Sequence, residues 1–224
     1  MISENLHKIR QEIQDSCALV SRKASDVRLV AVTKSVDTET TQILLDAGVT
    51  DCAENRVEQL LSKKQALRDY PHVKWHFIGN LQRRKVKSII NEIDYFHALD
   101  SLKLAQEIQK RAEQPINCFV EVNVSQEASK QGISSEEVDG FIRDLASLDN
   151  IRVIGLMTMA PLNASSSERH QLFKTLKQIQ QRIADLHLTH APCLETSMGM
   201  SNDFPEAIQE GATFIRVGTA LFQE

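Results

Sequence analysis

The stretch Leu29-Val30-Ala31-Val32-Thr33-Lys34 is an apolar run, rich in β-branched residues, that ends on a lysine and is followed by a helical pattern starting near Asp37. The same succession of an apolar run and a helical pattern recurs along the chain. Runs that are apolar throughout, rather than alternating, are typical of parallel strands covered on both faces. The predicted strands are 28–33, 50–54, 73–78, 95–99, 117–124, 151–158, 192–195 and 213–217.

The regular alternation of strand and helix predicts a parallel sheet of the α/β class. Eight such units close most naturally into a single (β/α)8 TIM-type barrel, and an open, doubly wound sheet is the alternative. Ahead of the first strand, apolar residues at steps of three and four predict an extra N-terminal amphipathic helix. These residues are Ile2, Leu6, Ile9, Ile13, Cys17 and Val20.

Four pairs of residues predict where helices begin and end. Ala47-Gly48 and Glu210-Gly211 have the pattern of glycine stops at helix C-termini. Ser134 with Glu137, and Ser165 with Glu168, have the spacing of capping boxes at helix N-termini.

Composition and charge indicate one ordinary globular domain. The chain has 224 residues, 42% of them hydrophobic and 25% charged, with no linker-like segment, so we expect a single domain spanning 1–224. A net charge of −4 gives no reason to bind nucleic acid or an anionic membrane, and we interpret the basic cluster 83–87 as a solvated helix face. The lack of a signal-peptide pattern and of a long apolar run predicts a cytoplasmic protein, which we expect to be a monomer.

The cysteines and histidines give no pattern of a metal site. Cys17, Cys52, Cys118 and Cys193 are scattered without a CxxC pair, which predicts buried thiols. His187 and His190 have the spacing of a ligand pair, but no further ligand accompanies them. We therefore expect no bound metal.

Polar residues directly after the predicted strands are the candidates for function, because barrels carry their sites at the carboxyl ends of the strands. Lys34 is one: an amine among apolar walls has a lowered pKa and can form an imine with an aldehyde, whereas the alternative is a lysine that only extends to solvent. Asn55 either contacts a ligand or caps the next helix. His76 interrupts an apolar strand, as a ligand contact or as a satisfied core histidine, and Gly79 would allow backbone to approach a ligand.

The two C-terminal loops, 195–203 and 216–220, have the composition of an anion site. Loops after the seventh and eighth strands commonly bind a phosphate in barrels, through backbone N–H groups and hydroxyls. Ser197, Ser201, Gly218 and Thr219 have this chemistry, although helix caps and turns explain each loop taken singly.

Taken together, these motifs resemble the pyridoxal 5′-phosphate (PLP) homeostasis protein family, also known as the YggS or PROSC family, which shares the fold of the alanine racemase N-terminal domain. Two positions depart from the family pattern: Ala53 stands where the family usually has glycine, and Arg56 where it usually has an aromatic residue. The motifs that carry the resemblance are Ala31-Val32-Thr33-Lys34, Glu54-Asn55, His76-Phe77-Ile78-Gly79 with Leu81-Gln82, Gly155-Leu156-Met157, Ser197-Met198-Gly199-Met200-Ser201 and Arg216-Val217-Gly218-Thr219.

The resemblance implies a role for each matching residue. Lys34 would hold PLP as a Schiff base, Arg216 would face the pyridine nitrogen, and Met200 would lie near the phosphate loop. The phosphate would be held by Ser197, Ser201, Gly218 and Thr219, and the ring would be lined by Asn55 and His76.

These roles favour a carrier over an enzyme. An arginine beside the ring nitrogen disfavours the protonated pyridine on which carbanion chemistry depends, and neither Tyr70 nor Tyr95 is predicted at the carboxyl edge, where a two-base racemase needs a tyrosine. We expect a non-catalytic protein of PLP and amino-acid homeostasis that buffers the cofactor, with transient contact to PLP-dependent apo-enzymes. The alternatives are a weak PLP-dependent amino-acid racemase, a Schiff-base aldolase acting on a sugar phosphate, and an interaction module that responds to PLP.

Overall fold

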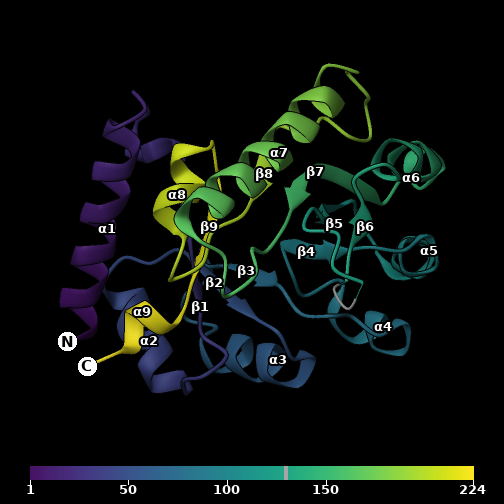
Figure 1. Cartoon of the computed structure of the whole chain (residues 1–224). Helices are drawn as coiled ribbons and strands as arrows, with labels where there is room; N and C mark the ends of the chain where they lie inside the picture. The colour runs from purple at the N-terminus through teal and green to yellow at the C-terminus, as the bar shows by residue number, and fades with distance from the viewer. Residues whose placement is uncertain (129–130) are drawn as a thin grey trace.

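The computed structural model describes residues 1–128 and 131–224, and within them all strands belong to one parallel sheet (Figure 1). Each strand pairs with its neighbours in the order β4-β3-β2-β1-β9-β8-β7-β5, and β4 pairs with β5, so the sheet closes on itself. The predicted barrel is confirmed and the open sheet is excluded. The short β6 (Ile133–Ser134) pairs with the last two residues of β5. The barrel strands are β1 (Arg28–Val32), β2 (Asp51–Glu54), β3 (Lys74–Phe77), β4 (Tyr95–Leu99), β5 (Ile116–Asn123), β7 (Ile151–Met157), β8 (Glu195–Ser197) and β9 (Phe214–Val217).

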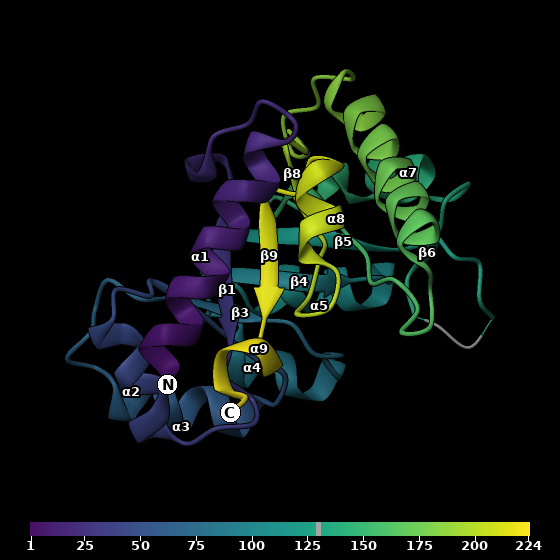
Figure 2. The same cartoon turned by 60° about the vertical axis from the view of Figure 1, so that its left-hand side comes forward.

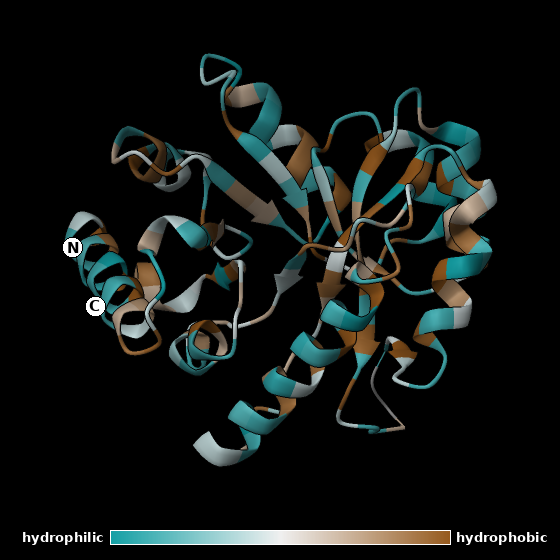
Figure 3. Ribbon diagram, turned by 90° about the horizontal axis from the view of Figure 1, so that it is seen from above, coloured by the Kyte–Doolittle hydropathy of each residue, from teal (hydrophilic) through white to brown (hydrophobic). Residues whose placement is uncertain are grey.

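The helices surround the barrel (Figure 3), and apolar residues of every α-helix in the described part of the chain are buried. The predicted N-terminal helix is confirmed as α1, which packs along the short helices α8 and α9 near the C-terminus (Figure 2). The Asn5 amide nitrogen donates to the carbonyls of Leu221 (3.1 Å) and Gln223 (2.8 Å), so the two ends of the chain are joined. The α-helices are α1 (Ile2–Ala18), α2 (Thr38–Asp46), α3 (Val57–Ala66), α4 (Val86–Ile89), α5 (Leu102–Arg111), α6 (Val138–Asp144), α7 (Ser166–Ala184), α8 (Phe204–Gln209) and α9 (Thr219–Phe222), with 3-10 turns at η1 (Ala24–Asp26), η2 (Arg83–Lys85) and η3 (Leu145–Ser147).

The predicted seventh strand is wrong in position. Strand β8 covers Glu195–Ser197, where it pairs with β7 in the register Gly155↔Glu195 and Met157↔Ser197. Cys193, in the middle of the predicted run, has a φ of 48° and lies outside the strand region of backbone space. The shift makes Ser197 the last residue of a strand instead of a loop residue.

Most of the predicted helix ends are confirmed. Gly48 and Gly211 follow α2 and α8 in the left-handed conformation, with φ of 91° and 100°. Ser165 and Glu168 form the predicted capping box of α7. The box at Ser134 is wrong, because Ser134 pairs in β6 and α6 begins only at Val138, so the Ser134 hydroxyl reaches the side chain of Glu137 instead (2.9 Å).

The structure also shows where the cysteines and the basic cluster lie. All four cysteines are buried and reduced, as predicted. In the basic cluster 83–87, Arg83, Arg84 and Lys87 are exposed, and Lys85 pairs with Glu58 (2.8 Å). Across the described residues no helix is both long and apolar enough for a membrane span, and no three His, Cys, Asp or Glu side chains gather as metal ligands.

Candidate functional site

A cavity of about 370 Å³ lies at the carboxyl ends of the barrel strands. Its walls include apolar side chains from the ends of β1 and β7 and from the segment 157–162. Most of the residues that the sequence singles out meet here. They are Lys34, Asn55, Met200, Ser201, Arg216, Gly218 and Thr219.

Lys34 enters this cavity because β1 ends two residues before it. Its side chain is exposed and makes no hydrogen bond or ion pair with any residue in the described part of the chain, so its amine is available to a ligand. The following helix α2 begins at Thr38, with Asp37 as its cap: the Asp37 carboxylate accepts from the Thr40 N–H (2.8 Å). The lysine is therefore set on a short, ordered connection between a buried strand and a capped helix.

A buried ion pair behind this connection was not predicted. Lys63 of α3 donates to the carboxylate of Glu54 and to the carbonyl of Thr33 (2.6 Å), the residue that precedes Lys34. The Thr33 hydroxyl donates to the same Glu54 oxygen (2.7 Å). Glu54 is fully buried and the Lys63 side chain is 7% exposed, so the pair joins the ends of β1 and β2 to α3 away from solvent. A lysine within a polar helix gives no sequence signal of burial.

The two loops predicted to bind an anion are adjacent in space. The Ser201 hydroxyl accepts hydrogen bonds from the N–H groups of Gly218 (3.3 Å) and Ala220 (3.1 Å), which joins the loop after β8 to the loop after β9. The backbone N–H groups of Ser201, Asn202 and Thr219 donate to no other group in the described residues, so they are free for a ligand. The structure thus brings unpaired donors together at one wall of the cavity.

Gly218 packs closely on β1, because a Cβ added there would lie 3.1 Å from the carbonyl oxygen of Val32. Gly79 lines the cavity and also allows two loops to pack together, because a Cβ there would lie 2.4 Å from the backbone oxygen of Asn55. Asn55 does not cap α3, whose N-cap is the exposed Arg56 without a side-chain bond. Its amide is left for the cavity.

Arg216 brings a buried positive charge to the cavity floor. Its guanidinium donates to the carbonyls of Ser197 (3.0 Å) and Thr158 (3.1 Å) and to the Ser197 hydroxyl. Burial lowers the pKa of Arg216 to about 10, against the opposing charges of Glu121 and Asp203, so it stays a cation at neutral pH. Because its donors are fixed by buried acceptors, it has a defined orientation.

His76 and Ser197 do not line the cavity. Both side chains are fully buried inside the barrel, where His76 bonds Asp51 (2.8 Å) and His97 (2.8 Å) and Ser197 bonds His97 (2.7 Å). For His76 the alternative of a satisfied core histidine is the one that the structure has. For Ser197 the cause is the shifted strand β8, which turns the hydroxyl into the barrel interior.

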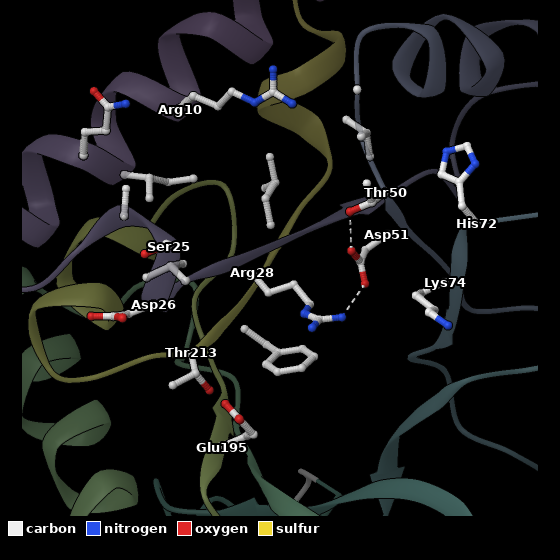
Figure 4. A pocket seen from close by; sticks show the side chains of 18 residues that line it. Arg10, Ser25, Asp26, Arg28, Thr50, Asp51, His72, Lys74, Glu195 and Thr213 are labelled. Carbon is white, nitrogen blue, oxygen red and sulfur yellow. Dashed lines mark hydrogen bonds and ion pairs between the residues drawn. The ribbon is translucent and has the colours of Figure 1, made fainter. Parts of the chain in front are cut away.

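Larger cavities lie elsewhere on the molecule, and two of them are next to the barrel ends. One, of about 620 Å³, adjoins the candidate site and shares Met159–Leu162 and Met200 with it. The other, of about 680 Å³, lies at the amino ends of the strands, around Arg28, Asp51 and Glu195 (Figure 4). Since barrels carry their ligand sites at the carboxyl ends of the strands, the 370 Å³ cavity with its lysine is the better candidate.

Comparison with known proteins identifies the family of this chain. The family described as "Alanine racemase, N-terminal domain" matches residues 5–224. A pyridoxal phosphate homeostasis protein of Aquifex aeolicus is 36% identical over 99% of this chain and 97% of its own length. Two solved structures superpose over the chain: an unknown protein from Bifidobacterium adolescentis (TM-score 0.94, 30% identity, 99% of this chain and 94% of the other) and PipY of Synechococcus elongatus with PLP bound (TM-score 0.87, 29% identity, all of both chains). The chain therefore belongs to the alanine racemase N-terminal domain family and, within it, to the pyridoxal phosphate homeostasis proteins.

Proposed function

We propose that this protein binds PLP in the cavity at the carboxyl end of the barrel, holds it through a Schiff base on Lys34, and acts in PLP homeostasis as a carrier and not as an enzyme. The observation that carries the proposal is that a lysine, a set of free backbone donors and a buried arginine share one cavity. A relative of the same length, PipY, was solved with PLP bound, and the homeostasis proteins match nearly the whole chain.

The residues present fit the chemistry of this cofactor. Bound PLP supplies an aldehyde, and Lys34 offers an amine without a competing ion pair among the described residues. The free N–H groups of Ser201, Asn202 and Thr219, with the Thr219 hydroxyl, suit its phosphate. The apolar wall from the segment 157–162 suits a ring, and Asn55 offers an amide to a ring substituent.

Arg216 supports the carrier role. A buried guanidinium donates hydrogen bonds and accepts none, so it pairs with an unprotonated ring nitrogen and opposes a second positive charge beside it. Neither tyrosine is placed to act as the second base of a racemase: the Tyr95 hydroxyl pairs with Arg28 at the amino end of the barrel (3.2 Å), and that of Tyr70 with Asp46 (2.6 Å). We infer that Arg216 holds the ring while Lys34 and the loop donors determine how tightly PLP is kept.

The experiment that tests the proposal is borohydride reduction followed by peptide mass analysis. After incubation with PLP and reduction, we expect the mass of one reduced pyridoxyl phosphate on the peptide that contains Lys34, and loss of the visible absorption band in Lys34→Ala. Lys87→Ala, at an exposed lysine of the basic cluster, is the matched control and should keep both signals.

Uptake of PLP that survives Lys34→Ala would refute the lysine assignment. A protein that takes up no PLP, yet is trapped by borohydride with a sugar phosphate, would favour the aldolase alternative. Slow conversion of L-alanine to D-alanine above the Lys34→Ala background would show that the protein has racemase activity and is not only a carrier.

A further inference from the structure

A continuous chain of hydrogen bonds runs through the interior of the barrel. Asp51 accepts from His76 (2.8 Å), His76 contacts His97 (2.8 Å), His97 contacts the Ser197 hydroxyl (2.7 Å), and that hydroxyl accepts from Arg216. These residues come from five different strands, β2, β3, β4, β8 and β9. The interior of this barrel therefore carries a polar line where branched aliphatic side chains are usual.

The proton positions along this chain are determined by its two ends. A carboxylate only accepts and a guanidinium only donates. The Nε2 of His76 must therefore carry the proton toward Asp51, which leaves its Nδ1 to accept from the Nε2–H of His97. The Nδ1 of His97 in turn accepts from the Ser197 hydroxyl, whose oxygen accepts from Arg216. With both rings neutral, every atom along the line has a partner and all donors point from Arg216 toward Asp51.

The charges of the groups agree with this arrangement. Burial lowers the pKa of His76, with Asp51 opposing, and lowers the pKa of His97 well below its ordinary value, with His76 and Arg216 acting in the same direction. Burial alone would raise the pKa of Asp51, but the hydrogen bonds from His76 and Thr50 and the charge of Arg28 hold it below its ordinary value. At neutral pH the chain thus joins an anion to a cation through two neutral imidazoles.

Ring packing holds the two histidines in place. The His76 ring stacks on Tyr95 with centroids 4.4 Å apart, and the His97 ring stacks on Phe119 at 4.6 Å. Phe214 meets both histidine rings edge-on, at 6.1 Å and 6.2 Å. Because the rings cannot turn freely, the hydrogen bonds along the line have a fixed geometry.

The two ends of the chain lie in different cavities. Asp51 lines the cavity at the amino end of the barrel, where it also pairs with Arg28 (3.3 Å) and Thr50 (2.7 Å), as Figure 4 shows. Arg216 lines the candidate cofactor cavity at the opposite end. A change at Asp51 therefore cannot touch a ligand at Arg216 directly.

We propose that Ser197 and His97, backed by His76 and Asp51, are positioning residues that fix the guanidinium of Arg216 at the cofactor cavity. Because the Ser197 hydroxyl donates its proton to His97, the lone pairs of its oxygen are directed toward Arg216. The other charges that face Arg216 are Glu121 on β5 and Asp203 in the loop after β8. Without the acceptor on Ser197, only the carbonyls of Ser197 and Thr158 hold the guanidinium against the pull of those carboxylates, so its orientation toward the ligand is less well fixed. The effect on PLP rests on the proposed function, whereas the arrangement of protons does not.

Nitrogen NMR of histidine-labelled protein without cofactor tests the arrangement itself. We expect His76 and His97 both to be neutral Nε2–H tautomers at pH about 7, and the His97 signals to move in Ser197→Ala. Thr196→Val is the matched control, because Thr196 is equally buried on the same strand but its hydroxyl bonds the Gly211 carbonyl (3.2 Å) outside the chain. A charged His97, or a proton on its Nδ1, would overturn the proposal.

PLP affinity, measured by titration of the visible band, tests the positioning role. We expect Ser197→Ala and His97→Leu to weaken binding about 10-fold or more, the effect of losing a hydrogen bond to a charged group. His97→Gln, whose amide can accept from Ser197 and donate to His76, should restore affinity to within about 3-fold, since the chain is again complete.

Asp51→Asn should weaken binding from the far end of the barrel, while Thr196→Val leaves it unchanged. Equal affinity of wild type and Ser197→Ala would overturn the positioning role. If the wild-type protein itself binds no PLP, the proposed function fails and the positioning role with it, while the NMR result still decides whether the proton chain exists.

Discussion

Removal of the Lys63 ammonium is the sharpest test of how the strand end at Lys34 is held. Lys63→Met keeps an apolar stem of four atoms but removes the ammonium. The buried carboxylate of Glu54 then loses its charged partner and keeps only the Thr33 hydroxyl as donor. The second Glu54 oxygen, Oε2, already has no partner in the described residues. Breaking a buried ion pair by removing one partner costs about 3–5 kcal/mol, since the remaining charge stays desolvated.

Urea unfolding measures this loss. With a denaturant slope near 3 kcal/mol per M, the upper end of the usual range, the midpoint should fall by about 1–2 M. Lys64→Met is the matched control: the neighbouring Lys64 on the same helix pairs with Glu92, but their side chains are 37% and 50% exposed, so the same substitution should cost at most about 1 kcal/mol.

The double variant Glu54→Gln with Lys63→Met separates the charge from the packing. It removes both charges and leaves no uncompensated ion, so it should be more stable than Lys63→Met alone. If Lys63→Met loses no more stability than Lys64→Met, the buried pair does not hold this strand end and the reasoning is wrong.

Two further predictions concern glycine and pH. Gly155→Ala should destabilise the protein by about 1–3 kcal/mol in urea unfolding, because its Cβ would lie 2.1 Å from the Glu195 carbonyl. Gly140→Ala is the control: it has open space in helix α6 and should stabilise the protein by about 0.5–1 kcal/mol. Similar urea midpoints for the two variants would contradict this. Burial and the charge of Asp100 raise the pKa of Glu121 to about 7, against the attraction of Arg216. The folded state therefore binds a proton at Glu121 more tightly than the unfolded state, and this contribution, at most about 3 kcal/mol, is complete below about pH 4.5 and is lost as the pH rises toward 7. Glu121→Gln should lose less stability than wild type between pH about 5 and 8, and equal losses would refute the assignment.

Much of the fold follows from local sequence signals. Apolar runs that are covered on both faces mark seven of the barrel strands to within two residues at either end, and glycine stops and a capping box mark helix ends at Gly48, Gly211 and Ser165. The seventh strand is predicted at the wrong place because Pro192-Cys193-Leu194 is mostly apolar, whereas the residues that actually pair, Glu195–Ser197, are polar or small. Their pairing is selected by β7 across the sheet, which no local window contains.

The candidate site also has a part that the sequence predicts and a part that it does not. Lys34, Ser201, Gly218 and Thr219 lie within four residues after the end of a strand, so a barrel topology alone brings them to one edge. The Lys63–Glu54 pair and the His97 contacts depend on side-chain direction inside the packed fold. His97 and Ser197 are a hundred positions apart in the chain, and nothing in the sequence around either one indicates that their side chains meet.

The polar line inside the barrel connects its amino end to its carboxyl end through hydrogen bonds. In barrels the amino end of the strands usually serves stability and the carboxyl end serves function. Here Asp51 belongs to the first by position and is connected to Arg216 in the second by four hydrogen-bonded steps whose protons all point one way. A substitution at the amino end that leaves the fold intact should therefore alter how the cavity holds its ligand, which distinguishes a barrel with a polar interior line from one filled by aliphatic layers.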